Sequence, residues 1–202
     1  REAAELDPIL ASISMEPAPD PKKYRNNVRF YTQEKKLMQH TMLTHENFEV
    51  RECFVVSDKT WESATNWKWK LPASISEIEI RENEKGEQMC IVSGTNRDQV
   101  PLHPAESLYF YDTAKKTYTH VAGSKTLTHH LEISGRHFDF DIGPDSFFQV
   151  HTAMAEILYR HISKVVPQTG TLHDLYAGTG TIGIVLAKLY PKLKVTSVEI
   201  NA

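Results

Sequence analysis

Ten residues near the carboxyl end of the sequence combine an acid with three glycines. Residues 174–183 read DLYAGTGTIG, and Gly178, Gly180 and Gly183 match the pattern G-x-G-x-x-G. Glycines allow a backbone to turn sharply and approach a ligand, and a helix that follows offers free N–H groups at its first turn. The pattern alone is a weak signal, because structural turns use it as well as ligand-binding ones.

The acids around this turn discriminate between ligands. A dinucleotide places its pyrophosphate at the helix start, whereas S-adenosylmethionine brings a carboxylate and an ammonium. Asp174 can meet that cationic end, and dinucleotide folds need no acid there. Glu199 follows where either ligand would offer ribose hydroxyls. We favour S-adenosylmethionine, and we keep a dinucleotide and a purely structural glycine turn as alternatives.

The elements around these residues read as one βαβ unit. Residues 171–176 indicate a strand, residues 181–190 a helix that Pro191 ends, and residues 194–199 a second strand. Such a unit implies a parallel sheet. A further helix over 152–165 has apolar side chains at helical spacing. It precedes the unit, which is therefore not the bare start of a dinucleotide domain.

Residues 21–142 predict an α+β domain with antiparallel strands. Three hairpins are expected, with turns at residues 83–86, at residues 112–116 and at Gly135. Residues 47–56 also carry apolar side chains at strand-like spacing. Residues 1–20 predict a helix and then a linker, because Pro17, Pro19 and Asp20 follow a short apolar set.

Charge limits how this protein could meet a nucleic acid. The 202 residues have a formal net charge of −3, so any RNA contact must come from a local basic patch. Residues 21–36 hold six Lys or Arg against one Glu, and the alternative is a solvated strand face. Trp67 and Trp69 alternate with lysines, which suits base stacking, although we favour core positions for them.

The cysteines and histidines argue against a metal site. Cys53 and Cys90 form no Cys-x-x-Cys pair, and His129 and His130 should point to opposite faces of a strand. Two isolated cysteines fit a reducing compartment. We expect an intracellular protein, with the cytoplasm favoured and a nucleus or organelle still open. No membrane partner is expected, because no apolar run reaches the ~20 residues of a span.

Three segments together carry a family resemblance. Residues 174–183 with Glu199 look like the cofactor site of the RNA uridine-5-methyltransferases, which make 5-methyluridine in transfer and ribosomal RNA. Residues 146–150 (SFFQV) resemble the S-F-F-Q-V-N stretch of that family, and residues 24–30 (YRNNVRF) resemble its Y-R-N-K-x-x-F stretch. Order and spacing agree, and the transfer-RNA branch is the most similar.

The resemblance implies both a fold and a site. The fold would be an α+β central domain at 21–142, followed at 145–202 by the first part of an α/β Rossmann-like S-adenosylmethionine-dependent methyltransferase domain. Residues expected near RNA are Arg25, Asn26 and Arg29. Expected cofactor contacts are Gln149, Asp174, Tyr176, Gly178, Gly180, Thr181 and Glu199.

Some of these positions have alternative interpretations. Gln149 could instead cap the following helix, and Tyr176 could pack under the turn. Phe147 and Phe148 are expected to serve packing. His151 stands where the family usually has Asn, and Ala177 stands where many members have Cys.

The resemblance also implies a chemistry that this sequence does not complete. In the family a Cys thiolate attacks C6 of uracil, C5 takes the methyl group, and a carboxylate then removes the C5 proton. Those residues follow the position of Glu199, so we expect them beyond Ala202. Cys53 and Cys90 are interpreted as buried structural residues. We therefore expect a truncated chain, inactive alone, with a marginal fold at 171–202 because a strand edge is left unpaired.

Three rival functions remain open at this stage. One is a methyltransferase with another target, such as cytosine or protein. Another is an RNA-binding module with a vestigial cofactor fold. The third is a dinucleotide oxidoreductase.

Overall fold

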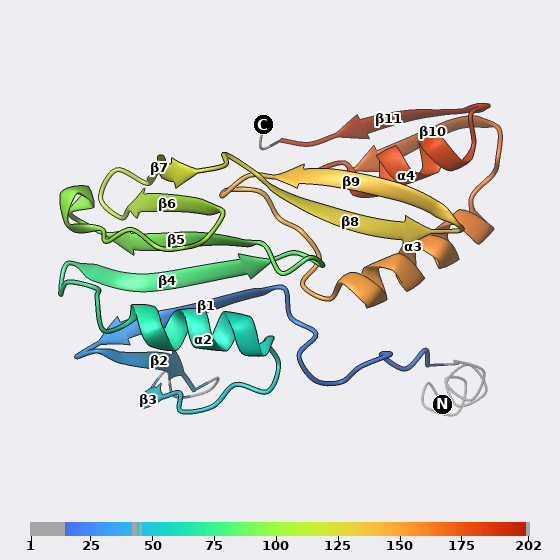
Figure 1. The fold of residues 1–202 in the computed structure, drawn as a ribbon. Helices are drawn as coiled ribbons and strands as arrows, with labels where there is room; N and C mark the ends of the chain where they lie inside the picture. Colours follow the sequence, from blue (N-terminus) through green and yellow to red (C-terminus); the bar gives the residue numbers. More distant parts are fainter. Residues whose placement is uncertain (1–14, 42–43, 45, 201–202) are drawn as a thin grey trace, which may run out of the picture.

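The computed structural model describes residues 15–41, 44 and 46–200 (Figure 1). The helix expected near the amino terminus falls largely on residues 1–14, outside the described residues. Residues 15–20 have no regular secondary structure, as expected of a linker. Among the described residues, no helix is long and apolar enough to cross a membrane.

One part of the molecule is a seven-stranded sheet in the order β3-β2-β1-β4-β5-β6-β7. Its strands are β1 (Asn27–Gln33), β2 (Lys36–His40), β3 (Asn47–Glu49), β4 (Ile75–Glu82), β5 (Gln88–Gly94), β6 (Ser107–Asp112) and β7 (Thr117–Gly123). Helix α2 (Asp58–Trp67) lies along one face, and the short 3₁₀-helix η1 (Arg97–Gln99) lies between β5 and β6.

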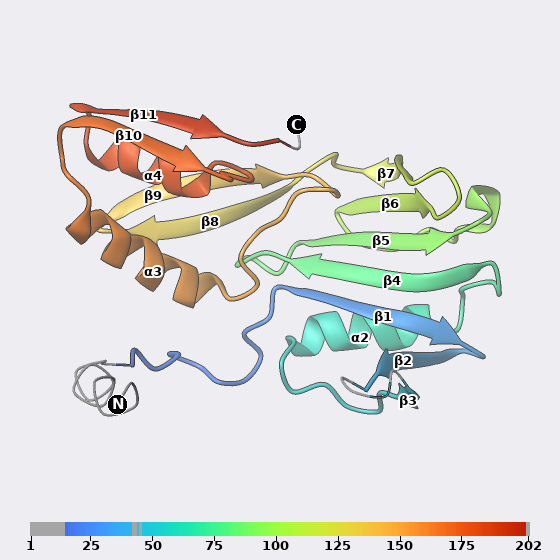
Figure 2. The same ribbon diagram turned by 180° about the vertical axis from the view of Figure 1, so that it is seen from behind.

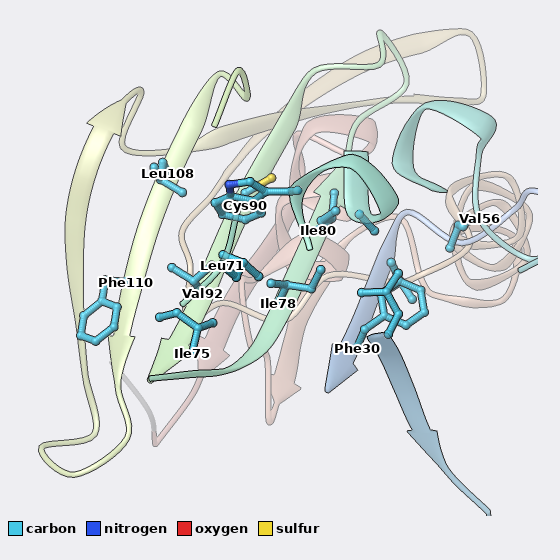
Figure 3. Packing of buried hydrophobic residues seen from close by; sticks show 14 residues of the cluster. Phe30, Val56, Leu71, Ile75, Ile78, Ile80, Cys90, Val92, Leu108 and Phe110 are labelled. Carbon is cyan, nitrogen blue, oxygen red and sulfur yellow. The ribbon is translucent and has the colours of Figure 1, made fainter. Parts of the chain in front are cut away.

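Alternation of side chains between the two faces of each strand explains how α2 and the sheet share a core. Phe30, Ile78 and Ile80 point to the α2 face of their strands, where Trp67 packs from the helix, and all are almost fully buried (Figure 3). Ser57 caps α2, because its side chain accepts a hydrogen bond from the N–H of Thr60.

The other part contains the elements of the glycine turn. They are the hairpin β8 (Leu127–Ile133) and β9 (Arg136–Ile142), helix α3 (Thr152–Val165), strand β10 (Gly170–Leu175), helix α4 (Thr181–Leu189) and strand β11 (Leu193–Val198). The hairpin lies beside α3 and α4 in both views (Figures 1 and 2). Leu131, Phe138 and Phe140 of the hairpin share one core with Tyr159 of α3 and Val185 of α4.

This packing bears on the expected organisation. The hairpin falls within the segment 21–142 by sequence, yet its apolar face packs on the two helices that follow. Where an independent domain would begin and end stays a prediction. The parallel pairing of β10 with β11 around α4 agrees with the expected βαβ unit.

Two local expectations were wrong. Only Asn47–Glu49 of the stretch 47–56 is a strand, and Phe54 is exposed. Residues 54–56 instead bond to residues 23–25, ahead of β1. The sheet is also not wholly antiparallel, because β5 and β6 pair in parallel. Residues 95–106, which include η1, carry the chain back to the same end of the sheet.

Candidate cofactor site

The glycine turn lies where β10 ends and α4 begins. Backbone conformations there are left-handed at Tyr176 (φ 59°), Gly178 (φ 56°) and Gly180 (φ 74°), and Gly180 is the N-cap residue of α4. The N–H of Ala177 donates to the carbonyl of Val198 on β11, at 3.0 Å. The turn is thus fixed at the carboxyl ends of two parallel strands, the position at which open α/β sheets bind ligands.

Asp174 supports the start of α4 from beneath. Its Oδ2 accepts a hydrogen bond of 3.0 Å from the N–H of Gly183. A Cβ atom on Gly183 would lie 2.5 Å from Oγ of Ser197 and 3.0 Å from that same Oδ2. Gly183 is therefore required for close packing of the helix on the strands. Asp174 already fills a structural role, because a carboxylate satisfies an N–H at the positive helix end.

Glu199 contacts the turn from the end of β11. Its Oε2 accepts a hydrogen bond of 2.7 Å from the N–H of Gly178, and its Oε1 accepts one of 2.9 Å from the N–H of Ile200. These bonds orient the acid toward the turn. The two acids singled out in the sequence thus bond to the first and the last glycine of the pattern, Gly178 and Gly183.

Tyr176 and Thr181 occupy opposite environments. Tyr176 is 90% exposed, which argues against the alternative that it packs under the turn. Thr181 is buried, with its hydroxyl 3.0 Å from that of Thr179. It also bonds to Tyr159 of α3. Burial raises the pKa of Tyr159, and the nearby Asp174 charge raises it further, although the bond to Thr181 lowers it.

Gln149 lies in the segment that leads into α3. The N-cap residue of α3 is His151, whose Nδ1 accepts from the N–H of Met154 at 3.4 Å. The alternative that Gln149 caps this helix is therefore wrong. Phe148 is buried in the core shared with α3 and α4, as expected, whereas Phe147 is 67% exposed and serves no packing there.

The residues expected near RNA divide into two groups. Arg25 and Arg29 are exposed and line a cavity of about 400 Å³ with Tyr31 and Gln39. Asn26 instead turns inward, because its Nδ2 donates to the carbonyl of Gln149 at 2.8 Å.

Arg29 is held by acids on β4. It pairs with Glu79 at 2.6 Å and lies 3.7 Å from Glu77. Burial alone would raise the pKa of Glu79, but the charge of Arg81 and the bonds from Arg29 and Arg81 lower it below its usual range. The sequence did not predict that Glu79 pairs with Arg29 and Arg81. Alternation of polar and apolar residues shows which face of a strand a side chain lies on, but not its partner on a neighbouring strand.

Neither cysteine has the environment of a nucleophile. Cys90 is fully buried with its Sγ 3.3 Å from Nδ1 of His103, and burial raises the pKa of the thiol. Burial also lowers the pKa of His103 to about 4, so the pair is neutral at pH 7. Cys53 is half-buried against the core beneath α2 but lies outside any strand. Among the described residues, no three His, Cys, Asp or Glu are grouped to hold a metal ion.

The tryptophans also differ from each other. Trp67 is buried in the core, as favoured from the sequence. Trp69 is 65% exposed, with Nζ of Lys68 5.3 Å from its ring centre, so a core position for it was wrong.

Several known proteins are similar to parts of this chain. No family model matches the chain. The tRNA (uracil-5-)-methyltransferase homolog B of Danio rerio is 34% identical over 138 residues, which are 55% of this chain and 28% of the relative. The protein of that name from Mus musculus is 31% identical over 112 residues, covering 50% and 23%. An uncharacterized RNA methyltransferase of Chlamydia muridarum is 42% identical over 77 residues, covering 37% and 19%.

This chain is similar to RNA uracil-5-methyltransferases. The resemblance inferred from three short segments is thereby confirmed. A solved structure, Pyrococcus abyssi tRNA (uracil-54, C5)-methyltransferase in complex with S-adenosyl-L-homocysteine, matches with a TM-score of 0.75 and 20% identity. The match covers 98% of this chain and 55% of that one, and it shows a shared fold. The chain spans less than a third of the length of these curated relatives.

Proposed function

We propose that this chain provides the cofactor-binding turn and an RNA-contacting sheet of an S-adenosylmethionine-dependent methyltransferase. Its target would be C5 of a uridine in RNA, with transfer RNA favoured. The observation that carries the proposal is the placement of Glu199 against Gly178 at the carboxyl ends of two parallel strands. The likeness to uracil-5-methyltransferases supports the choice of substrate.

The residues at the turn fit such a cofactor. A Cβ on Gly178 would meet nothing within 4 Å, so a ligand has room beside the turn. Tyr176, which lies in the turn, and Ile200, which follows Glu199, are 90% and 89% exposed, and they offer apolar surface for an adenine ring. Glu199 would accept from ribose hydroxyls. The cofactor, when bound, supplies an electrophilic methyl group.

The nucleophile is proposed to lie outside residues 1–202. Attack of a thiolate on C6 of uracil needs an accessible, deprotonated cysteine. Cys90 is buried with a raised pKa, and Cys53 packs against the core beneath α2. In the intact enzyme, the adduct at C6 would make C5 nucleophilic, and loss of the C5 proton after methyl transfer would release the cysteine. The target base would have to leave its stack.

RNA is proposed to contact the basic side of β1. Arg25 and Arg29 are exposed at one cavity, and Tyr31 beside them offers a ring for a base. Arg29 is partly neutralised by Glu77 and Glu79, so Arg25 is the freer partner for a phosphate.

We also infer an intracellular location, because a reducing compartment suits the two free cysteines.

Calorimetric titration with S-adenosylhomocysteine tests the cofactor proposal. Saturable binding is expected for the unaltered chain, and Glu199→Ala should weaken it about fivefold to 150-fold, because two hydrogen bonds to ribose correspond to about 1–3 kcal/mol. Glu62→Ala on the exposed side of α2 is the matched control and should bind as the unaltered chain does.

Three results would contradict the proposal. Equal affinity of Glu199→Ala and the unaltered chain would remove this acid from the site. Binding of NADH in place of S-adenosylhomocysteine would favour a dinucleotide oxidoreductase. Binding of transfer RNA with no cofactor binding would instead favour an RNA-binding module with a vestigial fold.

A further inference from the structure

Residues 143–150 join the two parts of the molecule, and the side chain of Arg81 on β4 bonds to the first of them. Nη1 of Arg81 donates to the carbonyls of Gly143 and Ser146, each at 2.9 Å, and Nη2 donates to that of Pro144 at 2.8 Å. The Arg81 side chain is only 11% exposed. A buried guanidinium that satisfies three backbone carbonyls fixes the path of a segment otherwise without regular structure.

Asn26 bonds to the last residues of the same segment, Gln149 and Val150. Its Nδ2 donates to the carbonyl of Gln149 at 2.8 Å and to Oγ1 of Thr152 at 3.1 Å. Its backbone N–H donates to the carbonyl of Val150 at 2.9 Å. The backbone and the side chain of Asn26 thus hold Gln149 and Val150, the two residues before the N-cap residue His151.

Asn26 and Arg81 lie close together, and other residues fix both of them in place. The N–H of Glu82 donates to the carbonyl of Asn26 at 2.8 Å, and Asn27 pairs with Arg81 in the β1–β4 register. Glu79 orients the guanidinium of Arg81 through a 2.7 Å ion pair. The contacts therefore come from one rigid corner of the sheet, where β1 begins and β4 ends.

Gln149 lies between this corner and the core of the other part. Phe148, just before it, is buried with residues of α3 and α4. We propose that Asn26 and Arg81 are positioning residues that hold the segment 143–150 so that Gln149 faces the cofactor. Together, these two residues and their bonds to the segment form a clamp. The inference rests on the proposed function. It assigns Asn26 to cofactor binding, in place of the RNA contact that the resemblance implied.

Asn26→Ala tests the clamp without removing a charge. Hydrogen exchange of the amides at 149–155 should speed up at least tenfold, while exchange in α4 stays unchanged. Affinity for S-adenosylhomocysteine should fall about tenfold, and affinity for unfractionated transfer RNA should change less than twofold. Asn66→Ala, at an exposed position on α2, is the matched control and should alter none of the three.

Arg81→Lys tests the other half of the clamp conservatively. A lysine keeps the charge beside Glu79 but cannot reach three carbonyls with a planar fork, so a smaller loss of cofactor affinity, about threefold to fivefold, is expected. Arg97→Lys, in the exposed η1, controls for the exchange of residue type. A split between cofactor and RNA affinity distinguishes positioning from general destabilisation, which would weaken both.

The outcomes separate this inference from the proposed function. Unchanged exchange at 149–155 in Asn26→Ala would overturn the clamp. Faster exchange with unchanged cofactor affinity would overturn the link to Gln149, and a fall in RNA affinity alone would return Asn26 to an RNA contact. Absence of cofactor binding by the unaltered chain would overturn the proposed function and the role assigned to Gln149, while exchange would still decide whether the clamp exists.

Discussion

At the scale of single residues, the three glycines of the turn are required for two different reasons. Gly178 and Gly180 have left-handed backbones that a glycine adopts without strain. Gly183 is needed for a different reason, because its missing side chain lets α4 approach Asp174 and Ser197. The same pattern therefore combines a conformational requirement with a packing requirement.

Gly183→Ala should destabilise the protein by about 1–2 kcal/mol. Overpacking against Ser197 and Asp174 costs about 1–3 kcal/mol, and the better helix propensity of alanine offsets up to about 1 kcal/mol. Urea unfolding measures the difference. Adding Ser197→Ala removes the atom 2.5 Å from the new Cβ and should restore part of the loss. A double variant as unstable as Gly183→Ala would show that this contact is not the cause.

At the scale of elements, the N-cap residue of α3 is a histidine, where the family that this chain resembles usually has asparagine. His151 caps the helix through a 3.4 Å bond, and its ring stacks on Tyr24 with 4.7 Å between ring centres. The asparagine usual in the family is among the best N-cap residues but offers no ring. A residue unlike the family pattern thus keeps the cap and adds a contact to the segment before β1.

His151→Ala should lower the free energy of unfolding by about 1–2 kcal/mol, since it removes both cap and stacking. His151→Asn should recover about half of this loss, because it restores the cap alone. Thermal unfolding followed by circular dichroism compares the two variants. If Asn is as destabilising as Ala, the cap contributes little and stacking on Tyr24 accounts for the effect.

At the scale of the whole molecule, Glu84 joins the two parts beside the clamp. It lies in the β4–β5 turn and bonds to Nδ1 of His129 at 3.1 Å and to Oγ1 of Thr152 at 2.9 Å. Burial opposes its ionisation, but the bonds from His129 and from the N–H of His130 outweigh burial and lower its pKa to about 2. His129 in turn stacks on Phe148.

This acid predicts a pH dependence of stability. Because the pKa of Glu84 is lowered in the folded state, its contribution is present above the unfolded value near 4.5 and is lost as the pH falls toward 2. Glu84→Gln should cost about 1 kcal/mol at pH 7, a value reduced for partial exposure to solvent. The difference from the unaltered chain should shrink between pH 4.5 and pH 2 in urea titrations. A constant difference across that range would assign the effect to shape and not to charge.

The sequence by itself determined most local elements and the place of the glycine turn. Alternating Ile78 and Ile80, a turn at 83–86 and the apolar run 89–92 predicted the β4–β5 hairpin. Helical spacing predicted α3 over 152–165, and glycines with Asp174 and Glu199 predicted a ligand site. These signals suffice because burial on one face and backbone freedom at a turn depend on neighbours in the chain.

Only the tertiary structure decided which distant groups meet. It paired β5 with β6 in parallel, packed the β8–β9 hairpin on α3 and α4, and turned Asn26 inward onto Gln149. It also separated exposed Phe147 from buried Phe148. Periodicity reports that a side chain is buried or polar but not its partner. A hydrogen bond between residues more than 100 positions apart depends on the packing of whole elements, which no local pattern contains.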